Sequence, residues 1–189
     1  MTNQEIYYSY LKKRSRIGDV YRKYFLYPKI DSVIIGRALD YGCGLGDFLK
    51  FRANTVGVDI NRFAIDHCLS RNLDAKLLGE SYRIPYDDGH FFSVVADNVI
   101  EHITAQEVDA VIEEIQRVLK KGGIVVAGVP GIKGHLYDTD HKVFYGEKHL
   151  VELFTKHGFT LKHIFRMPLP FQSLSKYLRQ YCIYAVFSH

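Results

Sequence analysis

Short apolar runs alternate with helical patterns through most of the chain. Apolar runs of this length between helical segments are typical of βα units, in which parallel strands are connected by helices. The pattern therefore predicts an α/β fold built around a largely parallel sheet. The predicted strands cover Ala38–Asp40, Thr55–Asp59, Ala75–Leu78, Phe91–Asp97 and Gly123–Val129.

Two of the connecting helices have clear start signals. Thr104 and Glu107 form a capping-box pattern, and apolar residues follow at helical spacing as far as Leu119. Asn61 is a favourable N-cap directly after Asp59. We therefore expect helices to begin at these two places, the second of them just after the Thr55–Asp59 strand.

The two ends of the chain depart from this pattern. Residues 1–30 mix tyrosines with basic residues and show no strand-like alternation, which favours short helices. Residues 167–189 contain two prolines and a final apolar run, which predicts an antiparallel strand at the sheet edge. A length of 189 residues allows one domain, with a helical segment over 1–30, a core over 37–166 and an edge strand within 167–189.

A glycine-rich turn follows the first predicted strand. Gly42, Gly44 and Gly46 stand at alternate positions between Asp40 and Asp47. Glycines let the backbone turn tightly and approach a ligand, and the next helix start offers free amides. The spacing differs from the Gly-x-Gly-x-x-Gly pattern of dinucleotide sites, and two carboxylates would repel a pyrophosphate. We expect a ligand with cationic groups, such as an ammonium and a sulfonium; a purely structural turn is the alternative.

Composition and charge narrow the class of protein. The chain has 47% hydrophobic and 24% charged residues, and its apolar runs are far shorter than the ~20 residues of a membrane span. Without a visible secretory signal, and with three cysteines at unpaired spacings, it is expected to be cytoplasmic with reduced thiols. The net charge of +4 includes a basic cluster between residues 12 and 23, which fits a solvated helix face better than a nucleic-acid site.

Five motifs in order resemble the class I S-adenosylmethionine-dependent methyltransferases, particularly the small-molecule branch that includes ubiquinone-biosynthesis enzymes. The motifs are Asp40–Gly46, Val56–Ile60, Gly79–Tyr86, Phe92–His102 and Arg117–Gly123. The resemblance covers about residues 37–166. It implies a three-layer Rossmann-like fold with a seven-stranded, mostly parallel sheet in the order 3-2-1-4-5-7-6, including one antiparallel strand.

The same resemblance implies a cofactor site for S-adenosylmethionine and its product S-adenosylhomocysteine. The acid and backbone of the glycine turn would hold the methionine end, Asp59 would accept the ribose hydroxyls, and Glu80 with Ser81 would contact adenine. At the position of Glu80 the family more often has aspartate. The expected cofactor-binding residues are Asp40, Gly42, Gly44, Gly46, Asp59, Ile60, Glu80, Ser81 and Asp97.

The acceptor side is less determined. A hydroxyl acceptor must lose a proton, and histidine, with an ordinary pKa near 6.5, suits that task. His135 and His141 follow the fifth predicted strand and are the candidate catalytic residues, whereas an orienting role is expected for His102. Asp138 and Asp140 lie between the two candidates, but local hydrogen bonding is the favoured reading of this stretch and no metal is expected.

The sequence thus predicts methyl transfer from S-adenosylmethionine to a small molecule, at a hydroxyl oxygen. A cofactor-binding or regulatory subunit without turnover is the alternative. Nucleic-acid methylation is disfavoured because Asp97-Asn98 is not followed by the prolines of exocyclic-amine enzymes. The sequence leaves the acceptor and the oligomeric state open.

Overall fold

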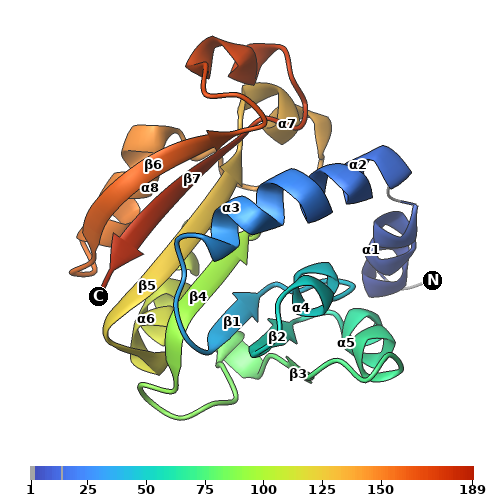
Figure 1. Ribbon diagram of the computed structural model, residues 1–189, viewed down its shortest axis with the longest axis vertical. Helices are drawn as coiled ribbons and strands as arrows, with labels where there is room; N and C mark the ends of the chain where they lie inside the picture. Colours follow the sequence, from blue (N-terminus) through green and yellow to red (C-terminus); the bar gives the residue numbers. More distant parts are fainter. Residues whose placement is uncertain (1–2, 14) are drawn as a thin grey trace.

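Seven strands form one sheet in the order β3-β2-β1-β4-β5-β7-β6 in this computed structural model (Figure 1). The structure describes residues 3–13 and 15–189, without the side chains of Asn3, Tyr7, Tyr10 and Glu80. The strands are β1 (Ala38–Tyr41), β2 (Thr55–Asp59), β3 (Ala75–Leu77), β4 (Phe91–Asp97), β5 (Leu119–Pro130), β6 (Thr160–Met167) and β7 (Cys182–Ser188). Only β7 runs antiparallel to its neighbours. The predicted fold class and strand order are confirmed.

The sequence predicts two different positions for the last strand. The pattern of residues 167–189 predicts a strand at the sheet edge, whereas the order implied by the family resemblance places the last strand between the fifth and sixth strands. In the structure β7 lies between β5 and β6, so the edge position is wrong. Its residues from Ile183 to Phe187 are all buried, so it needs a neighbouring strand on each side and cover on both faces. In β6 most residues are exposed or only partly buried, which an edge strand tolerates.

Helices cover both faces of the sheet. The α-helices are α1 (Asn3–Lys12), α2 (Arg16–Tyr21), α3 (Tyr27–Asp31), α4 (Asp47–Phe51), α5 (Arg62–Leu69), α6 (Val108–Val118), α7 (Ile132–Tyr137) and α8 (Glu147–Thr155). Shorter turns are η1 (Arg22–Leu26), η2 (Glu80–Tyr82), η3 (Ile100–His102) and η4 (Gln172–Lys176). Figure 1 shows α2, η1 and α3 as one nearly continuous rod across the sheet, with α1 beside α5.

Of the two predicted helix starts, the one at Asn61 is confirmed, whereas α6 begins at Val108 with Glu107, and not Thr104, as its N-cap residue. The Asn61 side chain accepts hydrogen bonds from the amides of Phe63 and Ala64 at the start of α5. Before α6, the Glu107 carboxylate accepts from the Thr104 amide, as in a capping box. The Thr104 hydroxyl, however, donates to Glu107 instead of accepting from its amide, so only half of the expected box forms.

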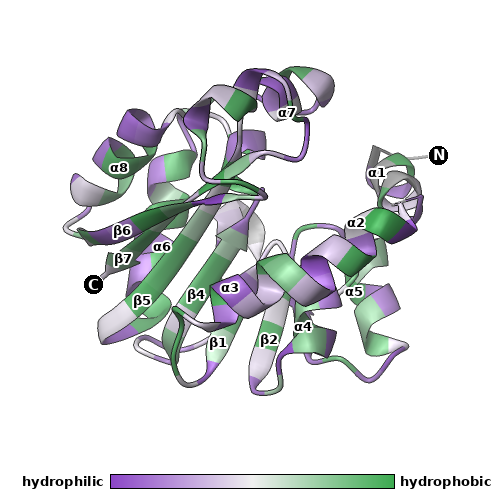
Figure 2. Cartoon of the chain, turned by 45° about the horizontal axis from the view of Figure 1, so that its top comes forward, coloured by the Kyte–Doolittle hydropathy of each residue, from purple (hydrophilic) through white to green (hydrophobic). Residues whose placement is uncertain are grey.

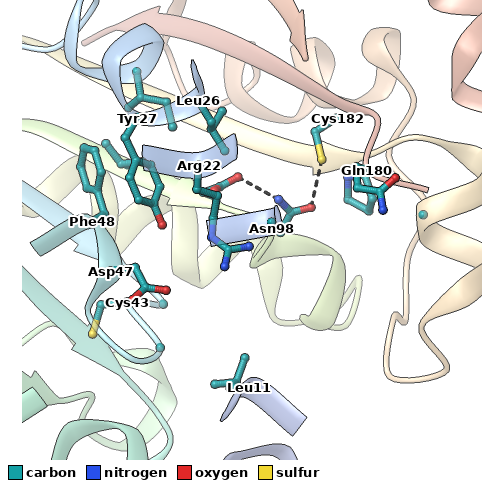
Figure 3. A pocket seen from close by; sticks show the side chains of 18 of the residues that line it. Leu11, Arg22, Leu26, Tyr27, Cys43, Asp47, Phe48, Asn98, Gln180 and Cys182 are labelled. Atoms are coloured by element: carbon teal, nitrogen blue, oxygen red, sulfur yellow. Dashed lines mark hydrogen bonds between the residues drawn. The ribbon is translucent and has the colours of Figure 1, made fainter. Parts of the chain in front are cut away.

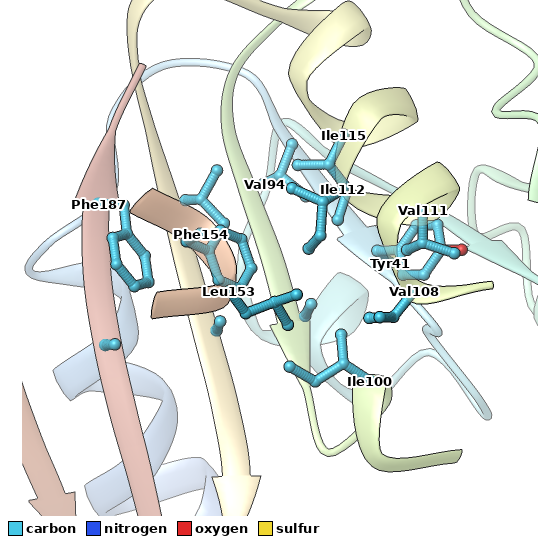
Figure 4. Close-up of a cluster of buried hydrophobic side chains, with 14 of the residues drawn as sticks. Tyr41, Val94, Ile100, Val108, Val111, Ile112, Ile115, Leu153, Phe154 and Phe187 are labelled. Atoms are coloured by element: carbon cyan, nitrogen blue, oxygen red, sulfur yellow. The ribbon is translucent and has the colours of Figure 1, made fainter. Parts of the chain in front are cut away.

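Alternation along the central strands builds two cores. Val94 and Val125 belong to the larger core, which the apolar stripe of α6 covers, whereas the next residues, Val95 and Val126, face α3 in a second core. Figure 4 shows the α6 side chains in the larger core, where the ring of Phe154 from α8 stacks on that of Phe187 at 4.6 Å. Figure 2 shows the hydrophobic stretches of β4 and β5 between the two helical layers. This burial on both faces explains the short, continuous apolar runs in the sequence.

Arg117, in the last turn of α6, forms hydrogen bonds with residues 84–88, which lie between β3 and β4. Its guanidinium donates to the carbonyls of Ile84 and Tyr86 and to the carboxylates of Asp88 and Glu114. Glu114 also accepts from the Ile84 amide. These bonds fix the course of the chain between β3 and β4, next to the carboxyl end of the sheet.

Replacing Glu114 with glutamine should lower the free energy of unfolding by about 1 kcal/mol at pH 7, because the pair is only partly shielded from solvent. The hydrogen bond from Arg117 is the first cause that lowers the pKa of Glu114. A lowered pKa stabilises the fold above the ~4.3 of an unfolded glutamate, and this stabilisation is lost as pH falls through the lower folded value. Urea unfolding at neutral and acidic pH measures this. Glu113→Gln, at an exposed neighbouring position, is the control. The prediction is contradicted if the loss of unfolding free energy in Glu114→Gln does not become smaller at acidic pH, or if Glu113→Gln causes an equal loss.

Candidate active site

A cavity of about 330 Å³, called the main cavity below, opens where β1, β2 and β4 end. This is the edge at which open α/β sheets bind ligands. The glycine turn, η1 and the start of β7 contribute to its walls, and Figure 3 shows Arg22, Tyr27, Asp47 and Asn98 around it. A smaller cavity of about 240 Å³ shares Gly42, Asp59, Asn98 and His102 with it.

The glycine turn brings the backbone to the wall of the main cavity. Gly42 has a φ of +79°, and a Cβ there would lie 2.4 Å from a methyl group of Val99, so no other residue fits without rearrangement. Gly44 has a φ of +51°, yet a Cβ there would meet only Leu11, at 3.7 Å. Both glycines line the main cavity. Gly46 lines neither cavity and instead precedes α4 in a left-handed conformation.

Asp59 braces this turn from the end of β2. One carboxylate oxygen accepts from the Gly44 amide at 2.9 Å, and the other accepts from the Asn61 amide at 2.8 Å. Asp59 is buried and lines both cavities. Each carboxylate oxygen can accept a second hydrogen bond, so Asp59 can hold the turn and still receive two hydroxyl groups of a ligand.

Among the described residues, five aspartates line the main cavity, together with Arg22 and Arg179. Three of these aspartates, Asp40, Asp59 and Asp97, come from the ends of β1, β2 and β4. Burial, and then the charges of Asp97 and Asp59, raise the pKa of Asp40 well above its usual range. The Tyr184 hydroxyl donates to Asp97 at 2.8 Å, and the Asn98 amide donates to the same oxygen. Buried negative charge of this density favours a cationic ligand.

The smaller cavity extends away from Asp59. Ile60 lines it although its side chain is 56% exposed, together with Leu78 and Tyr82. Ser81 has a φ of +52°, is exposed and lines neither cavity. The side chain of Glu80 lies outside the part of the chain that the structure describes. Within the segment that was expected to contact adenine, the side chain that the structure places at the smaller cavity is that of Tyr82.

Two of the described histidines line the main cavity. His141 and His102 line it, with their rings 4.6 Å apart. His135 does not line it and instead stacks on His141 at 5.2 Å. Burial, and then the neighbouring His141, lowers the pKa of both His102 and His135, which keeps these rings neutral at pH 7. Of the two candidate catalytic histidines, only His141 lines the main cavity, and the His135 ring packs against the His141 ring.

Sequence reasoning did not single out Glu101. Its side chain is fully buried beside His141, with 3.8 Å between a carboxylate oxygen and Nε2. Burial raises the pKa of Glu101 well above its usual range. The signal was an acidic residue in the loop after β4, directly before His102, but nothing local to that loop showed that it would be covered.

The first helix reaches the same edge of the sheet. The Gln4 side chain donates to the Ile60 carbonyl, and the Asn61 side chain donates to the Gln4 carbonyl. Leu11 from α1 and Arg22 from η1 line the main cavity. The N-terminal segment therefore forms part of the wall around the candidate site.

Known proteins share this architecture. Residues 39–127 match the methyltransferase domain family. Over 135 residues the chain is 27% identical to the uncharacterized protein MJ1123 of Methanocaldococcus jannaschii, covering 66% of this chain and 64% of that protein. Over 125 residues it is 32% identical to a sterol 4-C-methyltransferase of Caenorhabditis elegans, covering 60% and 36%. A SAM-dependent methyltransferase from Archaeoglobus fulgidus has the same fold over 100% of both chains, with a TM-score of 0.75 and 15% identity.

These matches have a limited extent. The matched part of the chain spans less than two thirds of the length of either curated relative. Within the described residues, no helix is long and apolar enough to cross a bilayer. The family match covers residues 39–127, and the similar solved structures show the same fold.

Proposed function

We propose that this chain, whose residues 39–127 match the methyltransferase domain family, transfers a methyl group from S-adenosylmethionine to a hydroxyl oxygen of a small molecule. The observation that carries the proposal is the set of three carboxylates around the main cavity, beside a glycine turn that leaves backbone room for a ligand. When bound, S-adenosylmethionine supplies an electrophilic methyl group on a positively charged sulfur. Its ammonium and sulfonium groups match the charge of this site.

The residues present fit the cofactor along its whole length. The main cavity lies within the ~300–1,000 Å³ typical of ligand sites, and the smaller cavity continues from it past Asp59. We assign the ammonium end to Asp40 with Gly42 and Gly44, and the ribose hydroxyls to Asp59. The adenine belongs in the smaller cavity, against Leu78 and Tyr82, with Ile60 at its rim. Asp97 adds negative charge near the sulfonium.

The chain's own contribution to the reaction is alignment and proton removal. Methyl transfer is an in-line displacement, for which correct placement of the reacting atoms can contribute about 7–11 kcal/mol. His141 and His102 line a wall of the main cavity, and we place the acceptor there, beside the cofactor's methyl group. A neutral imidazole in that wall can accept the proton of an acceptor hydroxyl. These two rings favour oxygen as the methylated atom.

Cofactor binding should depend on the ionisation of Asp40. The pKa of Asp40 is raised in the free protein, and a cation beside it lowers that pKa, so binding releases a proton and weakens as pH falls through the raised value. Calorimetric titration over a series of pH values below the ~7.7–8.0 of an α-amino group should give heats that differ between two buffers of different ionisation enthalpy. The difference should grow as pH falls and Asp40 becomes protonated in the free protein. Asp40→Asn should remove the difference. Equal heats in both buffers for the unmodified protein would contradict the placement of the ammonium.

Transfer of a labelled methyl group tests the proposed activity. The protein is incubated with methyl-labelled S-adenosylmethionine and a panel of hydroxyl, amine and carbon acceptors, and labelled products are separated by chromatography. The proposal expects label in a hydroxyl-bearing small molecule, together with formation of S-adenosylhomocysteine. Label only in amines or at carbon would overturn the choice of oxygen, and cofactor binding with no transfer across the panel would favour a non-catalytic subunit.

A further inference from the structure

We propose that Glu101, His102 and His141 bind a divalent transition-metal ion at the acceptor side of the main cavity. One ligand atom from each of the three lies within 4.8 Å of the others. Glu101 and His102 come from η3 after β4, whereas His141 comes from the loop after α7. The binding of the ion stands on this geometry alone; its role in the reaction rests on the proposed methyl transfer.

The Glu101 carboxyl group calls for a positively charged partner. Its side chain is 0% exposed, and within the described part of the chain neither carboxyl oxygen has a hydrogen-bond partner. The Glu101 carbonyl accepts from the amides of Lys142 and Val143, and these bonds hold the covering loop over the side chain. A buried carboxyl group without donors is costly unless a proton or a metal ion satisfies it.

His141 presents a nitrogen lone pair to this carboxyl group. Its Nδ1 lies 3.0 Å from the His135 carbonyl oxygen, to which it donates. In the neutral ring, Nε2 is then left as an acceptor, and it faces a Glu101 oxygen 3.8 Å away. Two acceptors that face each other need a cation between them. A histidine that donates one ring N–H to a backbone carbonyl and offers its other nitrogen is the usual arrangement of a metal ligand.

The groups around the three ligands add negative charge and leave the site open. The Asp140 carboxylate, 67% exposed, lies 3.5 Å from Nδ1 of His102, and Asp138 lines the main cavity. Lys142 is the nearest basic residue in the covering loop, and its side chain is exposed. With three protein ligands, the ion keeps positions for water or an acceptor from the main cavity.

The ligand set selects the kind of ion. Two imidazoles and one carboxylate suit Zn²⁺, Mn²⁺, Fe²⁺ or Co²⁺ better than the all-oxygen sites of Mg²⁺ and Ca²⁺. Ligands at about 2.0–2.2 Å from such an ion must draw closer together than the 4.8 Å observed, which small side-chain rotations allow. The sequence pointed to a different set around His135, Asp138, Asp140 and His141, and favoured no metal. In the structure only His141 of this set belongs to the cluster. Glu101 and His102 from η3 take the place of His135, Asp138 and the exposed Asp140.

Such an ion would act on the acceptor. With the ion bound, His102 and His141 act as its ligands and not as the base, so an acceptor hydroxyl that coordinates the ion has a lowered pKa and gives its proton to water. Its oxygen lone pair then forms the new O–C bond while the C–S bond of the cofactor breaks, and that electron pair stays on sulfur. No oxidant or reductant is needed.

Cobalt binding to the chelator-treated protein tests the site directly. Titration with Co²⁺, followed by visible absorption and calorimetry, should show one ion per chain, and Zn²⁺ should displace it. Glu101→Gln keeps the shape of the side chain and removes its charge; it and His141→Gln should each weaken Co²⁺ binding by about 100-fold or more. His149→Gln, at an exposed position on α8, is the matched control and should bind as the unmodified chain does.

The outcomes separate the ion from the cofactor. Titration with S-adenosylhomocysteine in the same samples reports both folding and the cofactor site. Weakened Co²⁺ binding with unchanged S-adenosylhomocysteine binding supports the metal site. Equal Co²⁺ binding by all variants, or no binding by an unmodified chain that binds S-adenosylhomocysteine, overturns it and leaves the proposed function intact. One Co²⁺ per chain without S-adenosylhomocysteine binding would instead overturn the proposed function.

Discussion

Replacing Asp59 with alanine should weaken S-adenosylhomocysteine binding by about 100-fold or more. The carboxylate accepts from the buried amides of Gly44 and Asn61, so its loss leaves both donors without this partner and loosens the glycine turn. It also removes the acceptor that we assign to the ribose hydroxyls. Hydrogen bonds to a charged group contribute about 1.5–3 kcal/mol each, and 1.4 kcal/mol corresponds to tenfold in affinity.

Calorimetric titration of the variants measures the effect. Asp59→Asn keeps one acceptor oxygen and should fall between the unmodified chain and Asp59→Ala. Asp66→Ala, on the exposed side of α5, is the matched control and should bind normally. Urea unfolding of each variant identifies any general loss of structure. An Asp59→Ala variant that is folded and binds within about threefold of the unmodified chain would show that the ribose lies elsewhere.

Replacing His141 with glutamine should lower methyl transfer by about 100- to 10,000-fold while S-adenosylhomocysteine binding persists. His141 lines the main cavity and is not among the residues that we assign to the cofactor, so its loss should affect the acceptor and not the cofactor. His135→Gln should have a smaller effect, because the His135 group that bonds to His141 is its backbone carbonyl, which the substitution keeps.

Single-turnover transfer with a saturating acceptor measures this prediction, and His149→Gln again serves as the control. The expected order of rates places His141→Gln far below His135→Gln, with His149→Gln equal to the unmodified chain. A His135→Gln variant that is slower than His141→Gln would contradict the assignment, because His135 does not line the cavity.

The strands and their chemistry could be predicted because they rest on local signals. The predicted strands that form β1, β2 and β4 are short runs that are mostly buried on both faces, whereas β3 buries only Ala75, and the structure confirms the sheet order. Asn61 caps α5 as expected, and this places Asp59 at the end of β2, beside the glycine turn. Asp40, Gly42 and Gly44 line the main cavity for the same reason: each follows a strand end within a few residues.

The rest depends on contacts between distant parts of the chain. Glu101 is buried because the loop that carries His141 folds back, with the amides of Lys142 and Val143 on its carbonyl. No pattern near Glu101 reveals that cover. The pairing of Tyr184 with Asp97 likewise requires β7 to enter the sheet beside β5, where the sequence predicted an edge strand. Such tertiary neighbours decide which acids and histidines meet.

Calorimetric titration of the unmodified chain with S-adenosylmethionine and with NAD⁺ tests the central claim most directly, because the two ligands place opposite charges at the glycine turn. The account predicts one S-adenosylmethionine per chain, competition by S-adenosylhomocysteine, and no heat with NAD⁺. Saturable binding of NAD⁺ at that turn, with no heat from S-adenosylmethionine, would contradict it.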